Sequence, residues 1–173
     1  MGEVKRNQEL QHPALNPLCS DIQQRLIQSC AQDIMATMIL PPKFNRYDVG
    51  EEYRAHYDAP YMQTPSGQVR TDYSMTLFLS EFEGGELCLG DNRIKGSVGE
   101  CVVYPSNQLH RVAPVTKGVR ICAISWIQSQ IADPHKRDLL MRLRDAIGGM
   151  EKFSDTQTEV AGIHGELMRM WSA

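Results

Sequence analysis

Residues 73–105 read YSMTLFLSEFEGGELCLGDNRIKGSVGECVVYP, and their pattern is the strongest indication of the fold class. Short runs rich in β-branched and aromatic residues alternate with turn-forming glycine and asparagine at positions 84–85, 90–92, 96 and 99. No helical period joins these runs. We therefore expect several short antiparallel strands in this part of the chain.

The same pattern extends outward on both sides, from Phe44 to Gln128. The flanking runs are FNRYDV, EYRAHYD, LHRVAPV and VRICAISWIQ. Seven or more short strands at close spacing, with no helical pattern between them, indicate an antiparallel sandwich or barrel.

Helical patterns lie outside the strands. Apolar residues that recur every four positions predict an amphipathic helix over about residues 17–39, with Ser20 and Gln23 as a candidate capping box at its start. Pro41-Pro42 should end it.

Two more helices are expected after the strands. Asp133-Pro134 is a good N-cap and first-turn pair, and Gly148-Gly149 is a stop signal. A last apolar stripe at helical spacing ends at Trp171. The expected architecture is mainly β with flanking helices.

Composition and charge narrow the class of protein. The 173 residues suffice for one domain and are few for two. Hydrophobic residues make up 42% and charged residues 23%, which is typical of a globular protein, and a net charge of −3 argues against a nucleic-acid partner. We interpret the one basic cluster as a solvated helix face; it consists of Lys136, Arg137, Arg142 and Arg144.

The five cysteines are odd in number and form no CxxC pair, which is typical of a reducing compartment. The first residues, MGEVKRNQELQHP, contain no apolar stretch that resembles a signal peptide, and no uncharged run approaches membrane-spanning length. We therefore predict a soluble cytoplasmic protein without a membrane partner.

The triplet His56-Tyr57-Asp58 suggests a metal site. In a strand, His56 and Asp58 would point to the same face and so hold one ion. His110, between two expected strands, is the candidate third ligand. Two histidines and one carboxylate leave coordination positions open, as in non-haem iron(II) oxygenases. On spacing alone, either histidine is as readily a surface or hydrogen-bonded core residue.

Arg120 comes ten residues after His110, across a turn at residues 116–118, so we expect the two on neighbouring strands. Arg120 shares a strand face with apolar residues, where an arginine is costly unless it is paired. A dicarboxylic co-substrate would supply the partner through two parallel hydrogen bonds. The alternative is that Arg120 faces outward or pairs with a protein carboxylate.

The segment YDVGEEYRAHYD resembles the Y-x-x-G-x-x-Y-x-x-H-x-D motif of prolyl-4-hydroxylase-type 2-oxoglutarate dioxygenases. Further segments are similar, in the same order, to the bacterial PKHD-type hydroxylases of the PiuC/YbiX group. They include PPKFNRYDVG, RTDYSMTLFL, VVYPSNQLHRVAPVTKGVR and SWIQSQIADPHKRDLLMRL. The similarity covers nearly the whole chain.

This resemblance implies a double-stranded β-helix (jelly-roll, cupin-like) core with iron(II) on His56, Asp58 and His110. It also implies 2-oxoglutarate against Arg120 and L-ascorbate as the reductant of the iron. The implied reaction uses O2 to hydroxylate an unidentified prolyl, peptidyl or small-molecule substrate, while 2-oxoglutarate is decarboxylated to succinate and CO2.

The resemblance further implies a dioxygenase domain over residues 1–130 and a C-terminal helical extension over residues 131–173 packed on the same domain. By analogy with prolyl hydroxylases, Tyr47 and Thr76 lie near the co-substrate, although any core neighbour would satisfy Tyr47 equally well. Trp126 is expected to pack in the barrel.

Two other residues bear on the chemistry. Arg70, at a loop edge, is more readily a solvated residue than a substrate contact. The Asp58 carboxylate favours hydroxylation over halogenation, because halogenases of this superfamily replace it with a small residue.

The chain departs from the family in two places. It lacks the portion that precedes the VK-x-N segment, and it is shortened between FLS and GGEL, so that His110 follows Asp58 by only 52 residues. These departures bear on the outer wall of the barrel, on the lid over the site and on whether the family's choice of substrate carries over.

Two alternatives to an active oxygenase stay open. One is a cupin-like metal or 2-oxoglutarate binding or sensing module that has lost turnover, and the other is a regulatory protein with a structural metal. The terminal helices would serve either to cover the barrel or to form a homodimer face.

Overall fold

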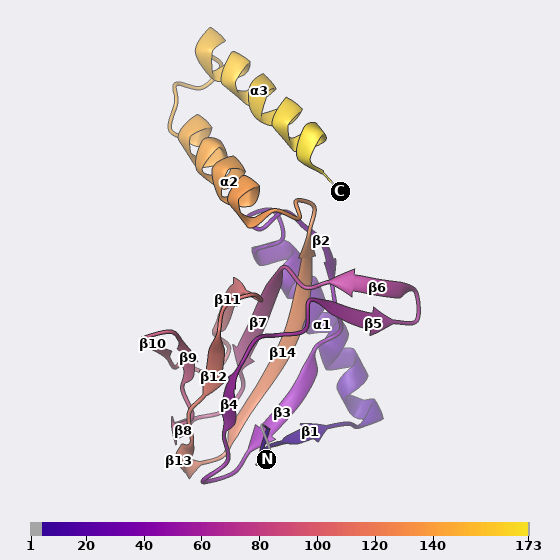
Figure 1. Ribbon diagram of the computed structural model, residues 1–173, viewed down its shortest axis with the longest axis vertical. Helices are drawn as coiled ribbons and strands as arrows, with labels where there is room; N and C mark the ends of the chain where they lie inside the picture. Colours follow the sequence, from indigo (N-terminus) through magenta and orange to yellow (C-terminus); the bar gives the residue numbers. More distant parts are fainter. Residues whose placement is uncertain (1–4, 173) are drawn as a thin grey trace.

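The computed structural model describes residues 5–172. A long central strand, β14 (Arg120–Ser129), organises the larger of two main β-sheets (Figure 1). The strand order is β1-β3-β14-β7-β11, and β2 pairs with the far end of β14. The other strands of the larger sheet are β1 (Gln8–Leu10), β2 (Ala36–Ile39), β3 (Lys43–Tyr47), β7 (Tyr73–Phe78) and β11 (Cys101–Pro105).

The smaller sheet has the order β10-β9-β12-β4 and is antiparallel throughout. Two separate strand pairs, β13-β8 and β5-β6, complete the β-structure. The bounds are β4 (Tyr53–His56), β5 (Tyr61–Thr64), β6 (Gly67–Arg70), β8 (Phe82–Gly84), β9 (Leu87–Leu89), β10 (Asn92–Ile94), β12 (His110–Val112) and β13 (Val115–Gly118). The predicted mainly β fold, a jelly roll with flanking helices, is confirmed.

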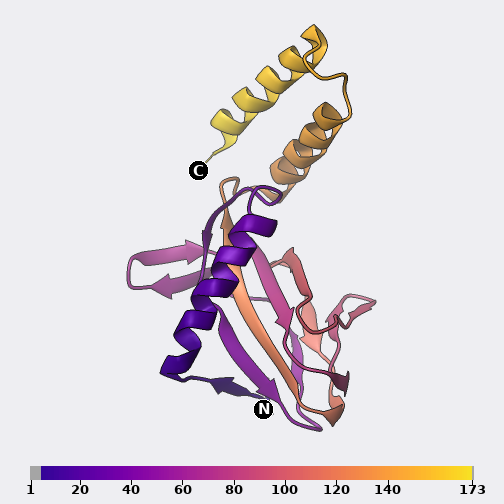
Figure 2. The same ribbon diagram turned by 180° about the vertical axis from the view of Figure 1, so that it is seen from behind.

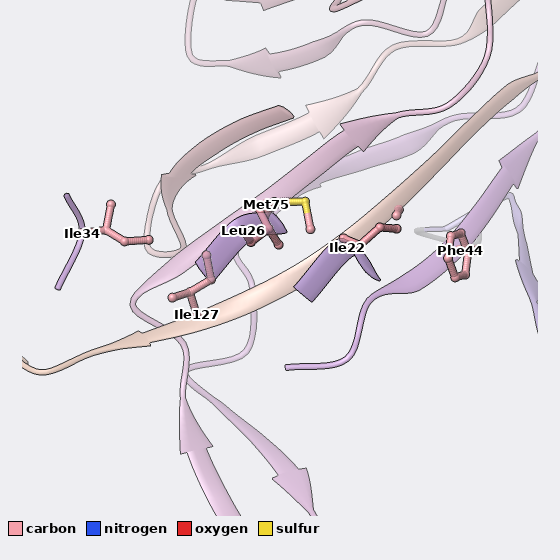
Figure 3. Packing of buried hydrophobic residues seen from close by; sticks show 7 residues of the cluster. Ile22, Leu26, Ile34, Phe44, Met75 and Ile127 are labelled. Atoms are coloured by element: carbon pink, nitrogen blue, oxygen red, sulfur yellow. The ribbon is translucent and has the colours of Figure 1, made fainter. Parts of the chain in front are cut away.

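Helix α1 (Asn16–Ser29) covers the outer face of the larger sheet (Figure 2). Ile22 and Leu26 of α1 pack against Phe44, Met75 and Ile127 from three strands (Figure 3). Each of these side chains is at least nine-tenths buried, and burial of such a side chain contributes about 1.5–3 kcal/mol as an upper estimate. This cluster supports the larger sheet from behind.

Successive residues of a strand point to opposite faces. In β14, Ala123 and Ile127 point to the α1 side and join its core cluster. Arg120, Cys122 and Trp126 point to the other side, toward the smaller sheet. The inner face of the larger sheet is therefore left to line a cleft.

The predicted helix over residues 17–39 is wrong in its second half. The helix ends at Ser29, the chain turns with Met35 at a φ of +50°, and β2 follows. The end of β14 extends beyond β3 and offers unpaired backbone groups, which β2 satisfies with Ile39 opposite Ile127. The four-residue spacing of apolar residues continued across this turn only by coincidence.

The predicted capping box is also wrong. A 3-10 turn, η1 (Pro13–Leu15), leads directly into α1, which begins at Asn16. Ser20 therefore lies inside the helix, where its hydroxyl donates to the backbone carbonyl of Asn16.

Helices α2 (Pro134–Gly148) and α3 (Asp155–Trp171) form a hairpin that extends beyond the sheets (Figures 1 and 2). As predicted, Asp133 caps α2, because its carboxylate accepts from the first backbone N–H groups. Arg144 forms an ion pair of 3.3 Å with Asp33 in the turn after α1. No helix among residues 5–172 is long and apolar enough to cross a membrane.

One member of the basic cluster is not solvated. Arg137 is only 5% exposed and forms an ion pair of 3.1 Å with Asp72. The first turn of α2 lies against the loop between β6 and β7, so this position faces the protein interior. The interpretation of the cluster as a solvated face is wrong at this residue.

Candidate metal centre

Three potential metal ligands converge at one end of the smaller sheet. The ligand atoms of His56, Asp58 and His110 all lie within 4.8 Å of one another. The His56 Nε2 is 3.9 Å from Asp58 Oδ1, and the His110 Nε2 is 3.8 Å from Asp58 Oδ2. Two imidazole nitrogens and a carboxylate at these separations match the donor set of a 2-His-1-carboxylate site.

The strand register brings the two histidines together. His56 ends β4, His110 begins β12, and the two residues are directly paired across these strands. Asp58 does not continue β4, as the i, i+2 strand argument assumed, but lies in the loop that follows. The loop turns the carboxylate back toward both imidazoles, so the predicted set is assembled by a different local geometry.

One ring nitrogen of each histidine is hydrogen-bonded to the backbone carbonyl of the residue two positions earlier. The Nδ1 of His56 is 2.8 Å from the carbonyl oxygen of Arg54, and the Nδ1 of His110 is 2.9 Å from that of Gln108. A carbonyl only accepts, so each Nδ1 carries a proton, and in the neutral imidazole the lone pair is then on Nε2. Burial also lowers the pKa of His56, which favours the neutral imidazole that a metal requires.

Asp58 is oriented from the larger sheet. Its Oδ2 accepts a hydrogen bond from the Ser74 hydroxyl on β7. The Ser74 oxygen in turn lies 2.8 Å from the hydroxyl of Ser106, in the turn before His110. This chain of hydroxyl groups links the carboxylate to the strand and the turn that position the rest of the triad.

The triad opens onto a cleft of about 380 Å³ between the two sheets. Leu87 and Val112 of the smaller sheet and Thr76 and Ile124 of the larger sheet are among its lining residues. Arg120 also lines this cleft. The prediction that it lies on a strand next to that of His110 is wrong, because β12 belongs to the smaller sheet and β14 to the larger one, and the two residues meet across the cleft.

The Arg120 guanidinium is the most unusual group in the cleft. Arg120 is 1% exposed, yet no carboxylate pairs with it among residues 5–172. Its Nη1 donates to the Cys122 thiol at 2.8 Å, and its buried Nε has no hydrogen-bond partner within the described part of the chain. The guanidinium carbon lies 5.0–5.7 Å from the ring centroids of Tyr47, Phe78 and Phe82. The alternative of an outward or carboxylate-paired arginine is therefore wrong.

Tyr47 and Thr76 also lie in this cleft, and both are buried. Tyr47 on β3 is paired with Arg120 across the strands. Burial raises the pKa of Tyr47, which keeps its phenol protonated and able to donate a hydrogen bond.

Three aromatic residues that line this cleft were not predicted from the sequence to be part of the site. Tyr53 stacks on His56 with ring centroids 3.7 Å apart, and Tyr104 packs edge-on against His110 at 5.2 Å. Trp126 was expected to pack in the barrel, and it does, but its buried Nε1 has no hydrogen-bond partner among residues 5–172. Alternation along β11 and β14 places Tyr104 and Trp126 on the inner face, and Tyr53 lies on β4. The distance of each ring from the triad depends on the sheet register.

Arg70 is not a solvated loop-edge residue. Its Nε is 3.0 Å from Asp72 Oδ1, and its Nη2 donates to the carbonyl oxygen of Ser129 at 2.8 Å. It lines a second cleft next to the triad rather than the first.

Comparison with known proteins identifies the family. Residues 42–128 match the family model described as the 2OG-Fe(II) oxygenase superfamily. A PKHD-type hydroxylase of Herminiimonas arsenicoxydans is 37% identical over 99% of this chain and 84% of that protein. A PKHD-type hydroxylase of Shewanella baltica is 40% identical over 97% of this chain and 81% of that protein.

Solved structures show the same fold. The viral collagen prolyl hydroxylase of Paramecium bursaria Chlorella virus-1 superposes with a TM-score of 0.58 at 20% identity, over 73% of this chain and 81% of that one. A prolyl-4-hydroxylase of Pseudomonas putida gives 0.52 at 22% identity, over 73% of each chain. Taken with the family match and the near full-length relatives, these findings make the chain an oxygenase that belongs to the PKHD-type hydroxylases of the 2OG-Fe(II) superfamily.

Proposed function

We propose that this protein hydroxylates its substrate with iron(II) held by His56, Asp58 and His110 and with 2-oxoglutarate bound through Arg120. The observation that carries the proposal is the buried Arg120 guanidinium, which lacks a carboxylate partner within the described residues and lines the same cleft as the triad. An uncompensated buried charge is costly, so its retention is best explained by an anionic ligand.

The donor set fits iron(II). Both imidazoles are held with Nε2 toward the Asp58 carboxylate, and among the described residues no fourth His, Cys, Asp or Glu joins the set. A structural metal site would close the coordination sphere with protein ligands. Three protein donors leave room for a chelating co-substrate and O2, which together with iron(II) supply the oxidizing chemistry that side chains lack.

The other end of the cleft fits the distal carboxylate of 2-oxoglutarate. The planar Arg120 guanidinium suits a carboxylate, and burial strengthens such a charge-assisted pair. The Tyr47 phenol stays neutral because burial raises its pKa, so it would donate to that carboxylate instead of repelling it. Thr76, also buried in the cleft, offers a further hydroxyl group.

The conditions of the reaction belong to the same proposal. All five cysteines are free, which suits a reducing, cytoplasmic setting, and L-ascorbate would serve to keep the iron reduced. The names of the relatives point to hydroxylation, and the prolyl or peptidyl specificity that their group name suggests stays a proposal for this chain.

The test is succinate formation from 2-oxoglutarate by purified protein supplied with iron(II), ascorbate and O2. We expect turnover in the wild type and none in His110→Ala or Arg120→Met. Anaerobic iron binding, measured by competition with a coloured chelator, should be lost in His110→Ala and retained in Arg120→Met.

His135→Ala and Arg93→Ala are the matched controls, because both side chains are exposed and outside the cleft. Both controls should match the wild type in each assay. Wild-type protein that binds iron but forms no succinate would favour the binding or sensing module, and Arg120→Met with full turnover would contradict the assignment of the co-substrate site.

A further inference from the structure

A second cleft of about 360 Å³ adjoins the metal centre. It shares Tyr57 and Asp58 with the first cleft, whereas Arg120 lines only the first. Asn107, in the turn that leads to His110, forms another part of its wall. A group bound in this cleft would therefore lie next to the ligand set but outside the proposed 2-oxoglutarate position.

Two arginines and one carboxylate form the inner end of this cleft. Asp72 accepts from Arg70 Nε at 3.0 Å, from Arg137 Nη1 at 3.1 Å and from the Ser129 backbone N–H at 2.8 Å. Arg137 also donates to the carbonyl oxygens of Ile131 and Ala132, at 2.7 and 2.9 Å. The contacts of Arg70 and Arg137 fix their guanidinium groups in place, and the Ser129 N–H holds the Asp72 carboxylate.

The charges at this inner end do not balance. Arg70 and Arg137 carry two positive charges, and Asp72 supplies one negative charge for both. The only other acidic residue that lines the cleft is Asp58, which belongs to the metal-ligand set.

Several donors also have no acceptor. Among residues 5–172, no acceptor is bonded to Arg137 Nε or Nη2, or to Arg70 Nη1, although Arg137 is 5% exposed. Unlike Arg120 Nε, these nitrogens are not fully buried, and the Arg137 guanidinium carbon also lies 5.0 Å from the ring centroid of Tyr73. They are therefore available to the acceptor oxygens of an anion in the cleft.

The rest of the cleft suits an organic anion more than a bare ion. Pro60, Pro134 and the exposed rings of Tyr57 and Tyr61 contribute apolar surface between the arginines and the solvent. Aromatic and proline surface of this kind packs against a carbon skeleton.

We propose that the second cleft binds a carboxylate of the primary substrate through Arg70 and Arg137, and so directs the neighbouring carbon toward the metal. This inference rests on the proposed function for its role in hydroxylation, but the binding itself needs neither metal nor 2-oxoglutarate. The substrate is thus a carboxylic acid, either a small molecule or a peptide that presents a carboxylate.

The test uses metal-free ¹⁵N-labelled protein and matched pairs of probes. N-acetyl-L-alanine is compared with N-acetyl-L-alaninamide, and a tetra-alanine peptide with a free C-terminus is compared with its C-terminal amide. Chemical-shift changes of the arginine Nε–H groups report binding. We expect each acid to bind roughly 10- to 100-fold more tightly than its amide, with shifts at Arg70 and Arg137. The tighter acid identifies a small-molecule or a peptide source.

Variants separate this cleft from the Arg120 site without breaking the ion pairs. Asn107→Asp adds a negative charge to an exposed turn of the second cleft and should weaken acid binding roughly tenfold or more. Asn92→Asp makes the same change at an exposed residue of β10 that lines neither cleft, and it should leave binding unchanged. Arg120→Met should also leave it unchanged.

Equal binding of acids and amides, or no binding of either, would overturn the proposal even if 2-oxoglutarate binding to the iron-loaded protein is intact. Acid binding that survives Asn107→Asp but is lost in Arg120→Met would assign the carboxylate to the first cleft and overturn it as well. Failure of the proposed function would appear instead as absent succinate formation with the acid titration unaffected.

Discussion

Replacing Arg120 by methionine should stabilise the metal-free protein and abolish 2-oxoglutarate binding at the same time. Methionine keeps an unbranched aliphatic stem against the surrounding rings and removes a buried charge that lacks a carboxylate partner among the described residues. Stability and function should therefore change in opposite directions at this position.

The magnitude follows from two opposing contributions. An uncompensated buried charge costs about 3–5 kcal/mol. Its contacts with three aromatic rings, at 5.0, 5.7 and 5.7 Å, offset about 1–2 kcal/mol of that cost. The net gain in the free energy of unfolding is about 2 kcal/mol, which corresponds to a rise in Tm of roughly 4–8 °C for a chain of this length.

Thermal unfolding followed by circular dichroism, with and without iron(II) and 2-oxoglutarate, measures both effects. Arg120→Met should melt at a higher temperature than the metal-free wild type and gain nothing further from 2-oxoglutarate. Arg93→Met, at an exposed surface pair with Glu86, should change stability little. A variant less stable than the metal-free wild type would show that the guanidinium is satisfied without a ligand, and would refute this reasoning.

Three further changes test other parts of the structure. Asp72→Asn leaves two largely buried guanidinium groups without their carboxylate and should cost about 3–5 kcal/mol in urea unfolding, against little change for the exposed Asp91→Asn; equal effects would contradict the ion-pair argument. Ser74→Ala removes the hydrogen bond that orients the metal-binding carboxylate and should weaken iron affinity about 10- to 100-fold in chelator competition, whereas unchanged affinity would leave this serine without a positioning role. Gly84→Ala should cost about 2 kcal/mol or more in thermal unfolding, because its φ is +67° and a Cβ would lie 2.5 Å from a backbone oxygen; Gly90→Ala, with a φ of +59° and open space, should cost less, and equal losses would show that crowding is unimportant.

The fold class could be read from the sequence because turn residues separate the short strand-like runs between Phe44 and Gln128. The error in the first helix was of a different kind. Apolar residues after Ser29 still recur every four positions, but part of this segment forms β2 because it pairs with the end of β14. Local periodicity carries no information about such an unpaired edge, so the helix could not have been ended correctly from sequence alone.

The metal-ligand set and Arg120 were predicted by residue type, spacing and resemblance, and the structure brings all four into one cleft. The way Asp58 reaches the set was predicted wrongly, since it lies beyond the strand. Arg137 could not have been placed, because its burial depends on the first turn of α2 packing against Asp72, which is 65 residues earlier in the chain.

The most direct test of the central claim is an anaerobic titration of 2-oxoglutarate into the iron(II)-loaded protein, followed by visible absorption. If His56, Asp58 and His110 hold the iron and Arg120 holds the co-substrate, the charge-transfer band of chelated 2-oxoglutarate should appear in the wild type. At 2-oxoglutarate concentrations that saturate the wild type, the band should be absent in both Arg120→Met and His110→Ala. A folded, iron-loaded wild type without this band, or a band that both variants retain, would contradict the account.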